Sequence, residues 1–256
     1  MIKKNIDVVI HLISLDHKKS ETIPHEVSNI NILPTWNLLE RFTNKGLIKF
    51  INFSSFQVYG NIERSTVKVT DLPNPNNMYG LSHYLSENIV NYYHANSSTE
   101  CINIRLSNSF GAPVFFENNC WWLVVNDLVK SAYDSKSINL LSDGTPQRDF
   151  IDLYDICNFI ETIIQNKSNV YNNTINLASG KTFTIYEIAE LVKDIYSELY
   201  NLDIPITLNQ TNGLKDNIQD RYTIDTSDLM QRGYKLKNDY KKSIKELFKY
   251  LEESNK

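Results

Sequence analysis

The chain of 256 residues has few cysteines, only 8 glycines and no long hydrophobic run. Its three cysteines, Cys101, Cys120 and Cys157, are odd in number and far apart, which predicts buried thiols in a reducing compartment rather than disulfides. No apolar run approaches the roughly 20 residues of a membrane span. The short apolar run at the N-terminus is interrupted by Asp7 and His11, and no cleavage site follows it. We therefore interpret it as a strand and expect a cytoplasmic protein.

Positive charge is also scarce. Lys and Arg number 26 against 30 Asp and Glu, a net charge of −4, so the chain has no overall field for nucleic acid or an anionic membrane. The cysteines and histidines lack the spacing of metal ligands, and we expect no metal site. The hydrophobic share of 41% and the charged share of 22% are typical of a globular protein with one large domain or two small ones.

Strands and helices alternate along residues 6–110, which favours an α/β domain with a parallel sheet. The run DVVIHLI at 7–13 is typical of a strand buried on both faces of such a sheet. Thr184 and Glu187 form a capping box ahead of another helix. Further strands are predicted at 48–53, 101–106, 138–141, 174–177, 204–208 and 222–224. Other helices are predicted at 35–42, 79–94, 121–133, 151–164 and 241–251.

Four separated segments carry polar side chains that could do chemistry. SSFQVYG at 54–60 follows a predicted strand, and strand ends in open α/β sheets are where ligands bind. YGLSH at 79–83 opens a helix and places Tyr79 and His83, four residues apart, on one helix face. The other two segments are RLSNSFG at 105–111 and DGTPQRDFID at 143–152.

These segments indicate proton transfer at a hydroxyl or carbonyl group. A tyrosine with a pKa near 10 is a weak base at pH 7, and a neighbouring cation would favour its phenolate. A serine hydroxyl near the same substrate oxygen can pass or stabilise the proton. Arg148 can hold a phosphate through two parallel hydrogen bonds.

In this order and spacing the four segments resemble the extended short-chain dehydrogenase/reductase superfamily, and within it the NAD-dependent nucleotide-sugar epimerase/dehydratase family. DVVIHL at 7–12 is similar to the family's fourth strand, and NLASG at 176–180 followed by Thr184 is similar to a later segment. The resemblance implies a partial Rossmann-type parallel sheet flanked by helices, with a smaller C-terminal α+β lobe. The domains implied are a truncated Rossmann-like domain at 1–111 plus 148–180 and a substrate-binding lobe at 112–147 and 181–256.

The resemblance also implies roles for single residues. Tyr79 would be the general acid/base, with Ser55 as its hydroxyl partner and His83 beside it. NAD or NADP would be bound by His11, Ser54, Tyr79 and His83, and the nucleotide-sugar by Asn108, Arg148 and Arg221. The implied activity is that of a UDP-glucose 4-epimerase, with tyrosine-assisted hydride transfer at a sugar carbon, in polysaccharide biosynthesis.

Two positions depart from the family pattern. The family's lysine, four residues after the tyrosine, is His83 here, and its unperturbed pKa near 6.5 leaves it mostly neutral at pH 7. The N-terminal fingerprint G-x-x-G-x-x-G is absent, together with two βαβ-sized steps on the order of 60 residues. We therefore expect the phosphate-binding loop to be lacking, dinucleotide binding to be weak, and the strand at 7–13 to form an apolar sheet edge.

Other activities and partners remain open. Dehydratases of the family carry Asp-Glu directly after the hydroxyl residue, where this chain has Phe56 and Gln57, so an epimerase or a 4-keto-sugar reductase is favoured. A catalytically silent nucleotide-sugar-binding subunit is the alternative from another class. The expected partners are a nucleotide-sugar substrate and either a second copy in a homodimer or a complementing N-terminal fragment.

Several of the candidate site residues also have a purely structural interpretation. Tyr79 could only pack its ring at a helix start, and His83 could be an ordinary surface histidine. Ser54 could only bond at a strand end, Arg105 fits an ion pair, and Arg148 beside Asp149 could form a structural salt bridge. The lysine-rich tail at 235–256 also contains acids and is typical of a solvated helix face.

Overall fold

The computed structural model describes residues 6–118, 120–166, 173–208 and 221–254. The chain divides into two compact units. The first comprises Met1–Ser107, Ile160–Leu177 and Asp225–Tyr234, and the second comprises Asn108–Phe159, Ala178–Ile224 and Lys235–Lys256. Residues 148–159, expected in the Rossmann-like domain, therefore belong to the second unit. The assignment of a cofactor domain and a substrate lobe stays a prediction.

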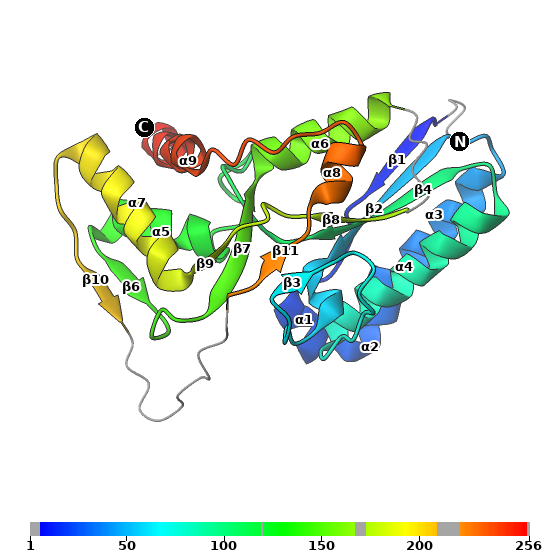
Figure 1. Ribbon diagram of the computed structural model, residues 1–256, viewed down its shortest axis with the longest axis horizontal. Coiled ribbons are helices and arrows are strands. Elements are labelled where there is room, and N and C mark those ends of the chain that lie inside the picture. The colour runs from blue at the N-terminus through cyan, green and yellow to red at the C-terminus, as the bar shows by residue number, and fades with distance from the viewer. Residues whose placement is uncertain (1–5, 119, 167–172, 209–220, 255–256) are drawn as a thin grey trace. The chain divides into compact units, whose positions relative to one another are not determined.

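The first unit contains a four-stranded sheet in the order β1-β2-β4-β8, in which every neighbouring pair is parallel (Figure 1). Its strands are β1 (Val8–His11), β2 (Lys49–Ser55), β4 (Glu100–Leu106) and β8 (Thr174–Leu177). This confirms the α/β fold class and the parallel pairing. The expected sheet edge at 7–13 is confirmed, because β1 is an edge strand of the sheet formed by the described residues. The burial on both faces that its apolar run indicated is wrong, and Ile10 is 42% exposed.

Helices α3 (Leu33–Thr43) and α4 (Met78–Asn96) pack against each other, and their apolar side chains meet β2 and β4. Leu39, Phe50 and Val90 are fully enclosed there. Gly46 adopts φ 81° in the turn after α3, a left-handed conformation that favours glycine where a helix ends. Residues 1–107 of the first unit also contain short elements: α1 (His17–Thr22), α2 (Pro24–Val27), the π-helical turn η1 (Ser28–Ile32), the 3₁₀ turn η2 (Phe56–Tyr59) and β3 (Thr66–Val67). The short helix α8 (Ser227–Gln231) belongs to the same unit.

The second unit contains two small sheets. The strands β5 (Asn108–Phe110), β7 (Gln147–Asp152) and β9 (Thr182–Thr184) form one sheet, with β5 parallel and β9 antiparallel to β7. Strands β6 (Ile138–Leu140) and β10 (Ile206–Leu208) form a parallel pair, and β11 (Thr223–Ile224) follows. Ile151 and Asp152 were expected in a helix, but they end β7, and α6 (Leu153–Gln165) begins after them.

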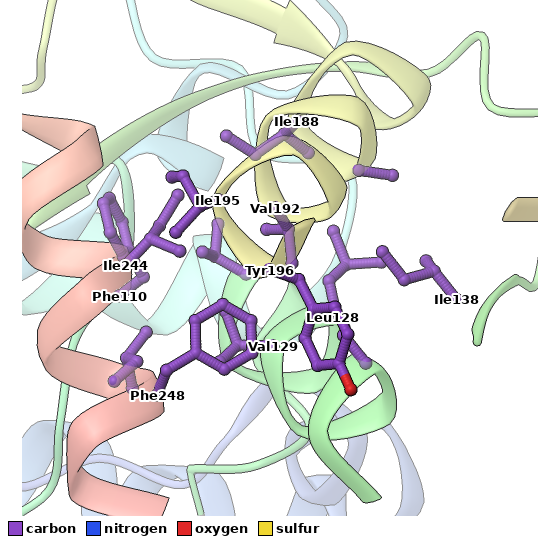
Figure 2. Packing of buried hydrophobic residues seen from close by; sticks show 14 of the residues in the cluster. Phe110, Leu128, Val129, Ile138, Ile188, Val192, Ile195, Tyr196, Ile244 and Phe248 are labelled. Carbon is purple, nitrogen blue, oxygen red and sulfur yellow. The ribbon is translucent and has the colours of Figure 1, made fainter. Parts of the chain in front are cut away.

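The core of the second unit lies between α5 (Val124–Ser135), α7 (Ile185–Tyr200) and α9 (Tyr240–Ser254). Figure 2 shows Val129, Val192 and Phe248 converging from these three helices. Thr184 and Glu187 form the predicted capping box at the start of α7. Helix α5 begins at Val124 rather than at Trp121, because the preceding residues form a turn.

Surface predictions for this unit have mixed outcomes. The lysines of α9 pair with acids, Lys241 and Lys245 with Glu198 and Lys249 with Glu253, which confirms a solvated charged face. Of the three free cysteines, Cys101 is buried as expected, whereas the prediction is wrong for Cys157, which is exposed on α6. No helix within the described ranges is long and apolar enough to cross a membrane.

Candidate active site

Ser55 and Tyr79 meet where the end of β2 approaches the start of α4. Ser55 is the last residue of β2 and caps η2, since its Oγ accepts a hydrogen bond of 3.2 Å from the Gln57 amide. Its hydroxyl also lies close enough to the phenol of Tyr79 to lower the pKa of that phenol. Burial raises the pKa of Tyr79, the Ser55 hydroxyl lowers it, and the Asp16 carboxylate raises it, with a net upward direction. The phenol is therefore protonated at neutral pH.

The close approach of α4 to η2 depends on Gly80. The side chain of Asn77 caps α4 by accepting from the Gly80 amide at 2.8 Å, and its Nδ2 donates to Gln57 Oε1 at 3.1 Å. A Cβ atom at Gly80 would lie 2.5 Å from the carbonyl oxygen of Gln57. Only glycine therefore allows the first turn of α4 to lie this near η2. This approach is what places Tyr79 beside Ser55.

His83 lies one turn after Tyr79 and is only 7% exposed. The two rings meet edge to face with centroids 4.5 Å apart, and His83 Nε2 lies 3.3 Å from Ser14 Oγ. Burial, with a smaller contribution from His11, lowers the pKa of His83 to about 4, although the Phe53 carbonyl opposes this. The imidazole is therefore uncharged at neutral pH, as its residue type indicated, and gives Tyr79 no cation.

The polar atoms of His11 and Ser54 are engaged within the first unit. His11 is buried, and its Nε2 lies 3.0 Å from Thr35 Oγ1. Ser54 Oγ donates to Glu87 Oε1 at 2.5 Å, which is the strand-end bonding considered from the sequence. The cofactor-binding roles of both residues stay predictions.

The three expected nucleotide-sugar residues belong to the second unit. Asn108 and Arg148 lie on the neighbouring strands β5 and β7, and Asn108 Nδ2 donates to the Asp149 carbonyl at 2.9 Å. Arg148 is exposed, and its Nη1 donates to the Gln147 carbonyl at 2.7 Å. Arg221 forms an ion pair with Glu187. The structure therefore brings Asn108 and Arg148 onto one sheet, while the side chain of Arg221 pairs with Glu187 in the first turn of α7.

Sequence analysis missed several residues around Tyr79. His17 lies with its ring centroid 6.2 Å from that of Tyr79, and Ser14 contacts His83. No motif marks the loop that carries Ser14 or the short helix α1 that begins at His17, so the sequence offers no signal for either of them. Glu87 could have been found, because positions 79, 83 and 87 share one face of a helix.

The described residues suit a ribose and the reacting carbon of a dinucleotide better than they suit its phosphate groups. Two hydroxyl groups and a neutral imidazole at the carboxyl end of β2 suit a ribose and a reacting carbon. The helix after β1 does not suit a phosphate, because the Asp16 carboxylate caps α1 and accepts from the Lys19 amide at 2.7 Å. No glycine-rich turn joins a strand to a helix within the described ranges. In those ranges no group of three or more His, Cys, Asp or Glu could hold a metal ion either.

The parallel sheet with its flanking helices defines a Rossmann-type α/β protein, and comparisons place it more narrowly. The model of the NAD dependent epimerase/dehydratase family matches residues 1–178, and the chain belongs to this family. A "UDP-glucose 4-epimerase" of Mycoplasma genitalium is 30% identical over 216 residues, covering 77% of this chain and 63% of the relative. The chain thus spans less than two thirds of that relative's length.

Other relatives differ in their named activities. A "dTDP-glucose 4,6-dehydratase" of Streptomyces antibioticus is 22% identical over 240 residues, covering 93% of this chain and 68% of the relative. Among solved structures, RMD from Pseudomonas aeruginosa complexed with NADPH has a TM-score of 0.82 at 21% identity, covering 99% of this chain and 84% of that one. The structural likeness shows a shared fold.

Proposed function

We propose that this chain carries the proton-transfer site of a nucleotide-sugar 4-epimerase that uses NAD or NADP. The observation that supports this most directly is the approach of the Ser55 hydroxyl, at the end of β2, to the Tyr79 phenol, at the start of α4. Membership of the epimerase/dehydratase family and the relative named as a UDP-glucose 4-epimerase agree with this proposal.

Each residue of the site has a stated role in the proposal. Tyr79 takes the proton of a sugar hydroxyl as that carbon is oxidised and returns it to the oxygen when the carbon is reduced. Ser55 hydrogen-bonds the same oxygen, and its bond from the Gln57 amide fixes its orientation. His11, Ser54 and His83 would contact the dinucleotide, which supplies hydride exchange when bound.

The nucleotide-sugar would be held by the second unit. Arg148 is exposed and carries a permanent positive charge, so its guanidinium suits a diphosphate. Asn108 lies on the next strand and would contact the sugar-nucleotide, with Arg221 as a further phosphate ligand. Because Arg221 is engaged with Glu187, we expect it to contribute less than Arg148.

Water elimination is disfavoured by the residues beside Ser55. The ring centroids of Phe56 and Tyr59 lie 5.2 Å apart, and the side-chain oxygen Oε1 of Gln57 accepts a hydrogen bond from Asn77 Nδ2. Neither side chain can donate or accept a proton near neutral pH. The dehydratase activity named for some relatives therefore lacks an acid–base pair at these two positions.

A 4-keto-sugar reductase is the second candidate, and the state of the Tyr79–His83 pair favours it. A protonated phenol beside a neutral imidazole can give a proton to a keto oxygen, but it must lose its own proton before it can act as a base. A catalytically silent nucleotide-sugar-binding subunit is favoured only by the lack of a phosphate-binding turn within the described residues. The partners, a second copy or a complementing fragment, stay predictions.

The test compares the chain with Tyr79→Phe in an assay that follows interconversion of UDP-glucose and UDP-galactose with NAD present. Loss of general acid/base catalysis should lower kcat about 10²- to 10⁴-fold, while UDP-glucose still raises the melting temperature. Tyr92→Phe, at an exposed position of the same helix, is the matched control and should keep full activity. Equal rates for the chain and Tyr79→Phe would refute the role of Tyr79. Stabilisation by UDP-glucose without any turnover would instead support the silent subunit.

A further inference from the structure

A buried ion pair joins α4 to β4 in the first unit. Glu87 on α4 is 1% exposed and Arg105 on β4 is 5% exposed. Arg105 donates a hydrogen bond to each carboxylate oxygen of Glu87, from Nε to Oε1 at 3.0 Å and from Nη2 to Oε2 at 2.8 Å. Two parallel bonds between a planar guanidinium and a carboxylate fix the relative orientation of the two elements as well as their distance.

The same carboxylate reaches the end of β2. Ser54 Oγ donates to Glu87 Oε1 at 2.5 Å, so Glu87 bonds at once to β2 and to β4. Arg105 extends the network on its other side, where Nη1 donates to the Tyr59 hydroxyl at 2.8 Å and the Tyr59 hydroxyl donates to Asn176 Oδ1 at 2.7 Å. The network thus ties α4 to the ends of the central strands and to the turn after β2.

Its position relative to the candidate active site is specific. Tyr79, His83 and Glu87 follow one another at intervals of four along α4, so they share one helix face about 12 Å long. Ser54 immediately precedes Ser55 in β2. The Ser54–Glu87 bond therefore connects the two elements that carry Ser55 and Tyr79, two helical turns away from Tyr79.

We infer that Glu87 and Arg105 are positioning residues that hold α4 against the end of β2, so that the Tyr79 phenol stays within hydrogen-bonding reach of Ser55. The catalytic meaning of this inference rests on the proposed function, but the packing of α4 against the end of β2 does not. Stability alone gives little reason for such a pair, because replacing a buried ion pair with apolar residues of similar size is often neutral. What apolar replacements cannot reproduce is the directional link to Ser54.

The test reads the phenol of Tyr79 directly, by NMR of protein labelled with ¹³Cζ-tyrosine at pH 7. Tyr79→Phe assigns the resonance, and Ser55→Ala gives its position when the neighbouring hydroxyl is removed. Ser54→Ala removes the hydroxyl bond to Glu87, and the double variant Glu87→Met/Arg105→Met removes the pair without leaving a buried charge. We expect both to shift the Tyr79 resonance toward its position in Ser55→Ala.

A second ion pair, between a buried lysine and a partly exposed glutamate at the opposite end of the same strands, provides the control. Lys49, at the start of β2, lies 3.2 Å from Glu100, at the start of β4. The double variant Lys49→Met/Glu100→Met should leave the Tyr79 resonance unchanged. If the resonance stays at its wild-type position in Ser54→Ala and in every folded pair variant, the inference is overturned. Ser54→Ala decides alone if the double variant does not fold. No substrate enters the measurement, so a negative epimerase assay leaves this result unaffected.

Discussion

At the scale of single residues, the uncharged state of His83 has the largest chemical consequence. The ring is enclosed among Tyr79, His11 and Ser14, and its pKa of about 4 keeps it neutral above about pH 5. Two carboxylates lie near the start of α4: Asp16 raises the pKa of the Tyr79 phenol, and Glu21 accepts from the Met78 amide at 2.6 Å. Removing a proton from a sugar hydroxyl should therefore become easier as pH rises, whereas donating one to a keto oxygen should not.

Replacing His83 with lysine should shift this balance. An ammonium group one turn after Tyr79 favours the phenolate and lowers the pKa of the phenol, so oxidation at pH 7 should rise about tenfold for each unit of that decrease. The measurement is the initial rate of oxidation of the nucleotide-sugar between pH 6 and 9. We expect the rising limb of the profile to move to lower pH in His83→Lys.

The control for this prediction is His83→Gln, which keeps a neutral polar side chain. Its profile should match that of the unaltered chain, because no charge is added. An identical profile in His83→Lys would contradict the prediction, since it would show that charge at position 83 does not reach the phenol.

The resemblance to the family implied that Ser55 and Tyr79 are partners, and their positions at a strand end and a helix start agree with this. The neutral state of His83 also agrees with its residue type. The ion pair of Arg105 was anticipated without its partner, since Glu87 becomes a partner only when α4 packs on β4. His17 and Ser14 could not be predicted, because no pattern marks the loop that carries Ser14 or the short helix α1 that begins at His17.

At the scale of elements, the close contact between α4 and η2 depends on the absence of a side chain at Gly80. In Gly80→Ala the new methyl group would lie 2.5 Å from the Gln57 carbonyl oxygen, so either α4 or η2 must move. Although alanine favours a helix more than glycine does, overpacking against backbone should outweigh that gain. We expect a loss of about 1–3 kcal/mol in the free energy of unfolding, measured by urea denaturation, together with a shift of the Tyr79 phenol resonance.

The neighbouring position on the same helix gives the comparison. Leu81 is exposed, and Leu81→Ala should change the stability by less than about 0.5 kcal/mol and leave the phenol resonance in place. If Gly80→Ala were as stable as the unaltered chain and kept its phenol resonance, the close approach at Gly80 would have no part in positioning Tyr79.

Elements with a strong apolar period were predicted well, and those held by local hydrogen bonds were not. The strands at β2, β4 and β8 and the helices α3, α4 and α9 were found with end errors of a few residues. The segment from His17 to Ile32 was left unassigned, because its helices are short and depend on contacts such as that of Asn31 Nδ2 with Ser82 Oγ. Ile151 was assigned to a helix because its apolar run continues into α6.

At the scale of the whole chain, each unit carries its own part of the proposed function. The first unit holds the hydroxyl groups that would move a proton, and the second holds the arginines that would bind a nucleotide. The resemblance to the family implied these roles because each rests on a short contiguous segment, and they stay predictions. It could not set the limits of the units, since residues 153–165 form one continuous helix, α6, that belongs partly to each unit.

Nucleotide binding should therefore depend on Arg148 far more than on Arg221. A charge-assisted hydrogen bond contributes about 1.5–3 kcal/mol, so Arg148→Met should remove most of the rise in melting temperature that UDP-glucose produces. Arg221→Met should reduce that rise only slightly, because Glu187 already holds its guanidinium at the start of α7. Lys130→Met, which breaks an ion pair with Asp134 on the surface of the same unit, controls for loss of positive charge and should keep the full rise. An undiminished rise in Arg148→Met would place the diphosphate elsewhere, because a ligand stabilises the folded chain less at the same concentration when its affinity falls.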